Sequence, residues 1–326
     1  MLKNQIKISY SYINILDGKD MPFNRLPLIK IASEKPGPTV WITACVHGDE
    51  VGGIIVTQEL VKKLKLELQC GNIFIIPLMN PLGFETMSRV LTLSSEDLNR
   101  SFPGNPNGSL AKRIAHHILS NITASRPDLV LDLHNDWSYS IPHALIDRRP
   151  NKNLNNVYKK VEELVKISGL LPVIDTDEPQ GSLSDSLVQK GIPSFTLELG
   201  ESYIVNEDNV RVGVKSVWNI LAHLKMVKTY MHFKYPIRHV VKEILVYSDK
   251  PLVSVSGIVR FKKYPGDFIK KGENFAEVYN IFGKCMESLT AKQNAVMLGF
   301  TDFAVAFPGT PVVALANYKE KNDQKK

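Results

Sequence analysis

Two histidines and two glutamates in this chain are of the residue types that a catalytic zinc site requires. His47 and Glu50 are three residues apart, and His134 and Glu198 follow later, each at or near the end of a short apolar segment. Two imidazoles and one carboxylate are a known ligand set for catalytic zinc, with one position left open for water. Taken singly, each residue is better explained as structural, because a histidine at a strand end commonly forms hydrogen bonds within the fold. Their combination predicts a metal-dependent hydrolytic site.

The apolar segments that carry these residues predict a sheet. Four short runs are largely apolar, as expected of strands buried on both faces. They cover residues 39–46, 72–78, 128–133 and 194–199. Helical patterns cover about residues 50–66, 109–120, 154–167 and 208–224. This alternation predicts an α/β domain with a largely parallel sheet, in which ligands bind beyond the carboxyl ends of the strands.

A long polar segment follows the second predicted strand. It contains Arg89 and then the residues DLNRSFPG, at positions 97–104. A loop of about twenty residues inside a compact domain is uncommon unless it has a function. The segment is therefore a candidate for substrate recognition rather than a solvated connection.

The helical patterns stop near residue 232. Short strands alternate with turns such as YPGD, KKGE and FPGT from there to about residue 318. We therefore predict a domain over residues 1–232 and a smaller all-β domain over residues 233–326.

The order of the motifs resembles one known family. HGDE, NPLGF with a later arginine, DLNRSFPG, LDLHN and LELG follow one another here as in the succinylglutamate desuccinylase/aspartoacylase family of the zinc carboxypeptidase-like superfamily. The resemblance covers roughly residues 35–205. It implies a mostly parallel mixed sheet flanked by helices, and a C-terminal β domain that covers or shapes the active site.

The resemblance also implies the metal site. His47, Glu50 and His134 match the ligands of one Zn²⁺ per chain, and Asp97 matches the carboxylate that orients the first histidine. A carboxylate bonded to the far nitrogen of a ligand histidine sets its tautomer. Zinc lowers the pKa of bound water toward ~7, which makes water a nucleophile at neutral pH.

The remaining motif residues match catalytic and substrate-binding positions of the family. Glu198 matches the general base, and Arg89 matches the arginine that polarises the scissile carbonyl. Asn99 and Arg100 match the pair that binds the free carboxylate of the substrate. The guanidinium of Arg100 offers the bidentate fork that a carboxylate requires.

The chain departs from aspartoacylases in one stretch. The aspartoacylases that this chain resembles have another arginine shortly before the catalytic glutamate. That arginine binds the side-chain carboxylate of the substrate. No arginine lies between Pro150 and Glu198. Arg148 and Arg149 are the nearest arginines that could replace the missing one, but they are better explained as residues of a surface loop. This disfavours N-acetylaspartate and favours a different N-acyl amino acid or a peptide-like substrate.

The C-terminal segment is similar to the barrel-sandwich fold of biotinyl and lipoyl domains. A carrier domain needs a modifiable lysine with flanking methionines at a hairpin tip, and Lys284 stands in FGKCMES without them. We therefore expect no carrier function.

Composition narrows the function classes further. The formal net charge is +7 and the chain contains 3 cysteines. No basic run is interleaved with aromatic residues, so we expect no nucleic-acid binding. No segment approaches the ~20 apolar residues of a membrane span, and no secretory signal is evident. An odd number of distant cysteines is typical of free thiols in the cytoplasm.

The sequence therefore predicts a cytoplasmic zinc-dependent amidohydrolase that deacylates a small, carboxylate-bearing N-acyl amino acid by metal-activated water. Two alternatives remain open: a metallocarboxypeptidase that acts on peptides, and a non-catalytic metal-stabilised binding protein. A homo-oligomer is also left open.

Overall fold

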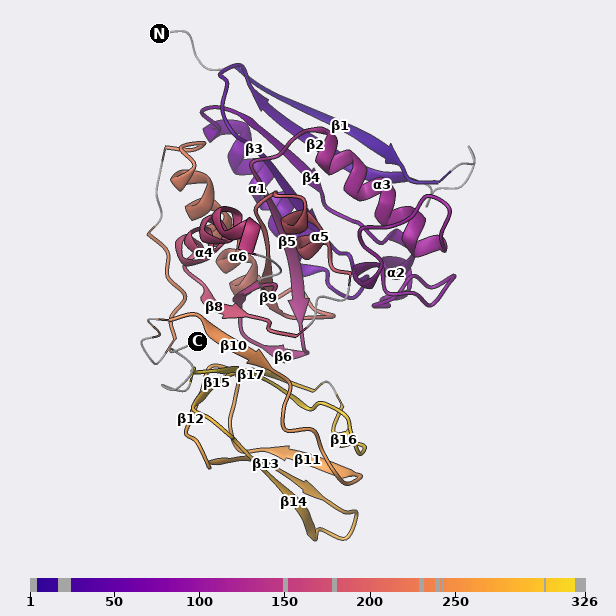
Figure 1. Cartoon of the computed structure of the whole chain (residues 1–326), viewed down its shortest axis with the longest axis vertical. Coiled ribbons are helices and arrows are strands. Elements are labelled where there is room, and N and C mark those ends of the chain that lie inside the picture. The colour runs from indigo at the N-terminus through magenta and orange to yellow at the C-terminus, as the bar shows by residue number, and fades with distance from the viewer. Residues whose placement is uncertain are drawn as a thin grey trace.

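A large mixed sheet with helices on both faces forms most of the molecule, and a smaller β-sheet lies at one end (Figure 1). The computed structural model describes residues 5–16, 25–148, 152–177, 181–228, 232–237, 241, 243–301 and 303–319. The first strands and the C-terminal strands lie at opposite ends of the longest axis, coloured indigo and yellow in Figure 1.

The four predicted strands form the centre of the large sheet and are confirmed. They are β3, β4, β5 and β9, they lie in the order β4-β3-β5-β9, and every neighbouring pair among them is parallel. The strands of this half of the chain are β1 (Ile6–Asn14), β2 (Arg25–Ser33), β3 (Thr39–Ala44), β4 (Asn72–Ile76), β5 (Leu129–Asp136), β6 (Tyr139–Ser140), β7 (His143–Ile146), β8 (Leu171–Ile174) and β9 (Ser194–Glu201). The antiparallel pair β1 and β2 extends one side, and β7 joins β9 in antiparallel orientation on the other.

The predicted helices are confirmed as α1, α3, α4 and α6. The helical elements are α1 (Gly52–Glu67), α2 (Pro81–Thr86), η2 (Leu98–Arg100), α3 (Leu110–Ala124), η3 (Lys152–Leu154), α4 (Asn155–Ser168), α5 (Leu183–Gln189) and α6 (Glu207–His223). The side chain of Asn206 caps α6 by accepting hydrogen bonds from the backbone N–H groups of Asp208 and Asn209, which satisfies donors that a helix start leaves unpaired.

Alternating side chains of the central strands pack on two different layers of helices. Val40 and Ile42 belong to the core that contains α1, α4 and α6. Trp41 and Val130 belong to a second core with α3 and α5. Because side chains alternate along a strand, Asp132 and every second residue after it on β5 face the α3 and α5 layer.

The C-terminal strands form a two-layered β module. They are β10 (Leu245–Ser248), β11 (Gly257–Phe261), β12 (Phe268–Ile269), β13 (Asn274–Tyr279), β14 (Cys285–Thr290), β15 (Ala295–Phe300), β16 (Val305–Ala306) and β17 (Val313–Asn317). Strands β10, β17, β15 and β12 continue the large sheet, and β14, β13, β11 and β16 form the second sheet. A shared core lies between the two layers and includes Val259, Phe275, Met297 and Leu315.

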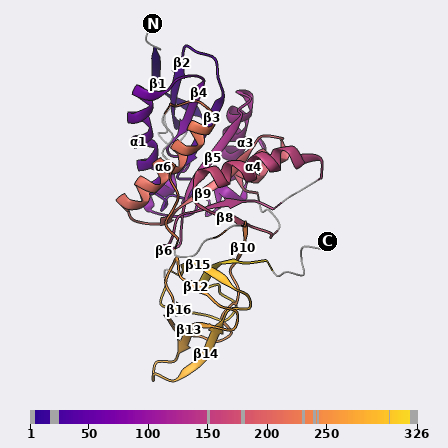
Figure 2. The ribbon, with the colours of Figure 1, turned by 90° about the vertical axis from the view of Figure 1, so that its left-hand side faces the viewer.

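The large sheet crosses the domain boundary that the sequence suggests near residue 233. Strand β10 pairs in parallel with β8, and β15 pairs with β6. Figure 2 shows the module directly below the helical layers. The boundary therefore stays a prediction, and backbone pairing holds the module against the rest of the chain.

Two sequence expectations concern the chain as a whole. Cys45, Cys70 and Cys285 are all free. Among the described residues no helix has both the length and the apolar character that a membrane crossing requires.

Candidate metal and active site

The turn after β3 brings His47 and Glu50 to the sheet edge. Strand β3 ends at Ala44, and Cys45 takes a positive φ of 54°. A Cβ on Gly48 would lie 1.9 Å from the carbonyl carbon of Gly83, so this position requires glycine. The turn therefore packs directly against α2, and it turns the next residues back over the carboxyl end of the sheet.

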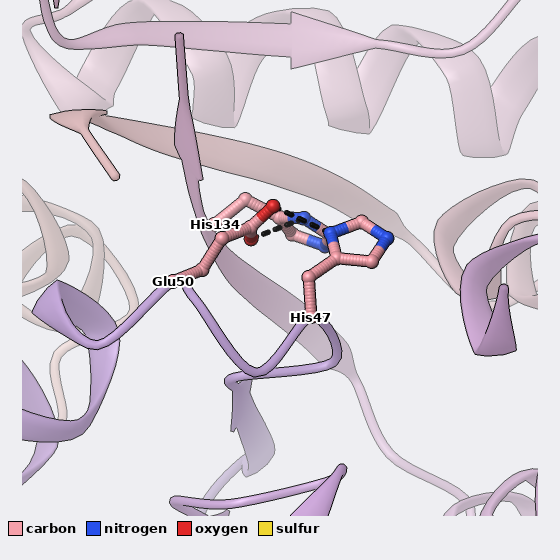
Figure 3. Close-up of side chains that lie close together, drawn as sticks. All are labelled: His47, Glu50 and His134. Carbon is pink, nitrogen blue, oxygen red and sulfur yellow. Dashed lines mark hydrogen bonds and ion pairs between the residues drawn. The ribbon is translucent and has the colours of Figure 1, made fainter. Parts of the chain in front are cut away.

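His47, Glu50 and His134 converge on one point (Figure 3). His47 Nδ1 lies 2.5 Å from Glu50 Oε1, and His134 Nδ1 lies 3.0 Å from Glu50 Oε2. One ligand atom from each residue lies within 4.8 Å of the others, and all three side chains are buried. The backbone N–H of Asn135 donates to Glu50 Oε2 at 3.1 Å, which fixes the carboxylate between the two rings.

Each histidine has a carboxylate at its other ring nitrogen. His47 Nε2 lies 3.2 Å from Asp97 Oδ1, and His134 Nε2 lies 2.9 Å from Asp132 Oδ2. The hydroxyl of Thr43 donates to the second oxygen of Asp132 at 2.7 Å. Carboxylates behind ligand histidines orient the rings and make them more basic. The sequence reasoning missed Asp132, although its spacing of two from His134 on a strand is a usable signal.

Electrostatics make this cluster suited to a divalent cation. Burial alone would raise the pKa of Glu50, but the His47 and His134 rings hold it well below its usual range. Burial would lower the pKa of His134, whereas Asp132 and Glu50 raise it. The cluster thus gathers three carboxylates around two imidazoles in a buried place, and a metal ion would compensate this charge.

Cys45 takes no part in the cluster. Its Sγ donates to the carbonyl of His47 at 3.2 Å, and burial raises the pKa of the thiol. The side chains of the described residues that are placed to share one metal ion are His47, Glu50 and His134, and Cys45 is not among them.

Glu198 lies beside the cluster. It is the register partner of His134 across the parallel pair of β5 and β9, so the two side chains project from the same face. Its Oε2 is buried without a hydrogen-bond partner in the described part of the chain. Burial raises the pKa of this carboxyl group well above its usual range, and Asp136 and Glu50 add to the effect.

Arg89 reaches the cluster from the loop after α2. Its Nη1 lies 3.6 Å from Glu50 Oε1, and its Nε lies 3.3 Å from Asp97 Oδ2. The side chain is 48% exposed. The guanidinium therefore borders both the carboxylates and the open space next to them.

Asn99 and Arg100 lie on the same short helical turn, η2. Asn99 is buried and its Oδ1 accepts a hydrogen bond from the backbone N–H of Leu183 at 2.9 Å. Arg100 is exposed, and its Nη1 donates to the carbonyl of Asn99 at 3.0 Å. Arg148 is exposed and Arg149 lies outside the described residues.

One cavity joins most of the predicted site residues. It has a volume of about 560 Å³, and every residue that the sequence suggested for the site contributes to its wall except Asp97. Tyr247, on β10 of the C-terminal module, also lines it. Burial raises the pKa of Tyr247, so its hydroxyl stays protonated. Sequence reasoning missed this residue because no local pattern connects β10 with the central sheet.

The comparison with protein families agrees with this geometry. The model of the succinylglutamate desuccinylase/aspartoacylase catalytic domain matches residues 36–224, which is more than half of the chain. The chain belongs to this family. An N-alpha-acetyl-L-2,4-diaminobutyric acid deacetylase from Halomonas elongata is 25% identical over 266 residues, which cover 78% of this chain and 74% of that relative.

Solved structures confirm the fold of the family. A succinylglutamate desuccinylase/aspartoacylase from Rhodobacter sphaeroides superposes with a TM-score of 0.78 at 21% identity, covering 96% of each chain. A structure from Shewanella denitrificans, whose name assigns it to carboxypeptidase A, reaches a TM-score of 0.53 at 18% identity and covers 68% of this chain and 66% of that one. The predicted zinc carboxypeptidase-like fold class is thereby confirmed.

Proposed function

We propose that this protein hydrolyses the amide bond of a small N-acyl amino acid, with one zinc ion held by His47, Glu50 and His134. The observation that carries the proposal is the convergence of two histidine Nδ1 atoms on Glu50 beside Glu198, a buried carboxyl group without a hydrogen-bond partner in the described part of the chain. A binding protein has no need of such a base. Membership of the family and the deacetylase name of the relative support the same activity.

The donor set fits zinc. Two imidazoles and one carboxylate leave a position open for water, and both rings are oriented by carboxylates at their far nitrogens. When bound, zinc supplies Lewis acidity, which lowers the pKa of water toward ~7 and polarises a carbonyl group.

The chain's own residues supply the proton transfers and the charge stabilisation. Glu198 accepts the proton of the attacking water and delivers it to the leaving nitrogen. Its place opposite His134 favours this role, as does its Oε2, which has no hydrogen-bond partner among the described residues. Arg89 stabilises the negative charge that develops on the carbonyl oxygen, which is commonly the largest single catalytic effect. Asp97 and Asp132 are positioning residues, since they act through the two histidines.

Asn99 and Arg100 are proposed to bind the free carboxylate of the substrate. Arg100 donates from Nη1 to the carbonyl of Asn99, and the residue lines the cavity. A planar guanidinium matches a carboxylate with two parallel hydrogen bonds, which fixes the register of the amide relative to the base.

The C-terminal module, proposed as residues 233–326 beside a catalytic domain of residues 1–232, is expected to restrict the substrate to small molecules. Its strand β15 pairs with β6, and its Tyr247 forms part of the cavity wall. A cavity of about 560 Å³ is in the range for small-molecule sites.

A substrate screen tests the proposal. Zinc-loaded protein is assayed against a panel of N-acetyl and N-succinyl amino acids and against dipeptides and longer peptides, and the released amine is quantified. We expect turnover of one or more N-acyl amino acids and little release from longer peptides. Faster release of C-terminal residues from peptides would support a carboxypeptidase instead. Tight ligand binding without turnover of any compound would support a non-catalytic binding protein.

A further inference from the structure

The cavity extends from Glu198 along β7. Strands β7 and β9 are antiparallel, with His143 opposite Glu198 and Leu145 opposite Thr196, and all four residues line the cavity. Asp147 follows at the end of β7, four residues from His143, which corresponds to about 13 Å of extended chain. The cavity therefore continues beyond Glu198 and reaches Asp147.

A second aspartate lies next to Asp147. Strands β7 and β8 are parallel, with Ile146 opposite Ile174, and the backbone N–H of Asp175 donates to the carbonyl of Ile146 at 2.9 Å. Asp147 and Asp175 thus leave neighbouring strands side by side, and both line the cavity. Within the described residues neither of them forms an ion pair with a lysine or an arginine. Burial raises the pKa of Asp147 to about 6, and repulsion from Asp175 contributes to the rise.

His143 adds a hydrogen-bond acceptor to the same wall. The side chain is 1% exposed, and its Nδ1 lies 3.1 Å from the carbonyl of Ile141, to which it must donate. Burial lowers its pKa to about 4, so the ring is neutral and Nε2 carries a lone pair. In the described part of the chain Nε2 has no partner. His143, Asp147 and Asp175 therefore all present hydrogen-bond acceptors to the cavity. Such a wall favours a ligand with several hydrogen-bond donors.

The proposed carboxylate-binding pair lies against this wall. Ser182 and Ser184 both donate to Asp147, and Leu183 between them donates its backbone N–H to Asn99. Arg100 is close enough to Asp175 to act on its pKa. The segment 182–184 thus contacts both Asn99, at the proposed carboxylate site, and Asp147, at a place suited to a cation.

We propose that Asp147 and Asp175 bind an ammonium group of the substrate, so that the substrate is an N-monoacylated diamino acid. This inference rests on the proposed function. The free carboxylate lies at Asn99 and Arg100, and the unacylated ammonium lies at the two aspartates. A side-chain carboxylate would instead meet two carboxylates, and no arginine between residues 150 and 198 is present to bind it.

Three N-acetyl amino acids of similar size test the inference. They are Nα-acetyl-L-2,4-diaminobutyrate, its uncharged isostere N-acetyl-L-norvaline, and the anion N-acetyl-L-glutamate. With zinc-loaded wild type, kcat/KM for the first should exceed that for the second about tenfold or more, because a hydrogen-bonded charge contact contributes on this scale. The isomer acetylated on the side-chain nitrogen is assayed in parallel and identifies which amide is cleaved.

Variants test whether Asp147 and Asp175 cause the preference for the diaminobutyrate compound. Asp147→Asn and Asp175→Asn should each reduce the ratio of kcat/KM between the diaminobutyrate and norvaline compounds by about tenfold, and Asp175→Lys should shift the preference toward N-acetyl-L-glutamate. Asp208→Asn is the matched control, because this aspartate is exposed on α6 and pairs with Arg211; it should leave the ratio unchanged.

The outcomes separate the two proposals. Equal wild-type kcat/KM for the diaminobutyrate isomers and norvaline, or an unchanged ratio in both asparagine variants, overturns the ammonium site and leaves the deacylase function standing. Turnover of none of the compounds in this test or in the wider screen overturns the proposed function itself.

Discussion

His134 and Glu198 are register partners on two adjacent parallel strands, β5 and β9. A metal-ligand candidate and a base candidate therefore project from the same face of the sheet at the same level. Because both strands are buried and hydrogen-bonded on both sides, the separation of the two side chains is set by the rigid centre of the fold. Such support is what a catalytic pair requires to keep its geometry.

The carboxylate behind His134 should tune metal affinity. Asp132→Ala removes the group bonded to His134 Nε2 at 2.9 Å, so the ring loses its fixed orientation. We expect zinc affinity to fall by about 10–100-fold, measured by competition with a chromogenic chelator. Asp208→Asn serves as the control, and an affinity of Asp132→Ala equal to that of wild type would remove Asp132 from the account.

The base prediction concerns Glu198. Glu198→Gln should retain zinc and the fold but lose about 10²–10⁴-fold in kcat, because a carboxamide cannot accept the proton of water. Steady-state kinetics and elemental analysis on the same sample check it. The exposed Glu207 on α6 offers the control Glu207→Gln. Near-normal kcat in Glu198→Gln would show that another group is the base.

The carboxylate prediction concerns Arg100. Wild type should hydrolyse an N-acyl amino acid much faster than its methyl ester or amide, and Arg100→Ala should lose most of this discrimination. Arg100→Lys keeps the charge but not the planar fork, so it should also raise KM. A charged hydrogen bond contributes about 1.5–3 kcal/mol. Equal wild-type rates on free and blocked substrates would argue against carboxylate recognition.

The raised pKa of Asp147 should make the stability of the protein depend on pH. Its pKa is raised to about 6 by burial, against ~3.9 in an unfolded chain. Between these values the folded state binds more protons than the unfolded state, so wild type loses stability as pH rises through this window. Relative to wild type, Asp147→Asn should therefore gain roughly 2 kcal/mol between pH 4 and pH 7.

Urea unfolding of both proteins at several pH values measures this difference. Titrating groups distant from Asp147 are common to the two proteins and cancel in the comparison. A free-energy difference that stays constant from pH 4 to pH 7 would mean that Asp147 has an ordinary pKa in the folded protein.

The central fold and the cluster of His47, Glu50 and His134 could be predicted from the sequence because their signals are local. Strands such as β3 and β5 are largely apolar runs. His47 lies three residues after the end of β3, and His134 lies near the end of β5. The position of Asp132 behind His134 could also have been predicted, because side chains two residues apart on a strand lie on the same face. In contrast, β1 mixes polar and apolar residues and is largely exposed, so it has no buried-strand pattern to detect.

The rest of the cavity depends on pairings between distant segments. Asp147 and Asp175 meet because β7 and β8 are neighbours, and Tyr247 reaches the cavity because β10 pairs with β8. No pattern within either segment specifies its partner strand. The features that we expect to determine substrate choice therefore appear in the three-dimensional structure and not in the motifs.

Zinc titration into metal-free protein, with the rate of amide hydrolysis followed on the best N-acyl amino acid, tests the central claim most directly. The rate should rise in proportion to bound zinc and level off at one equivalent per chain, and His134→Ala should show neither tight binding nor the rise. Hydrolysis by metal-free wild type at the full rate, or a rate that stays at zero beyond one bound equivalent, would contradict the account.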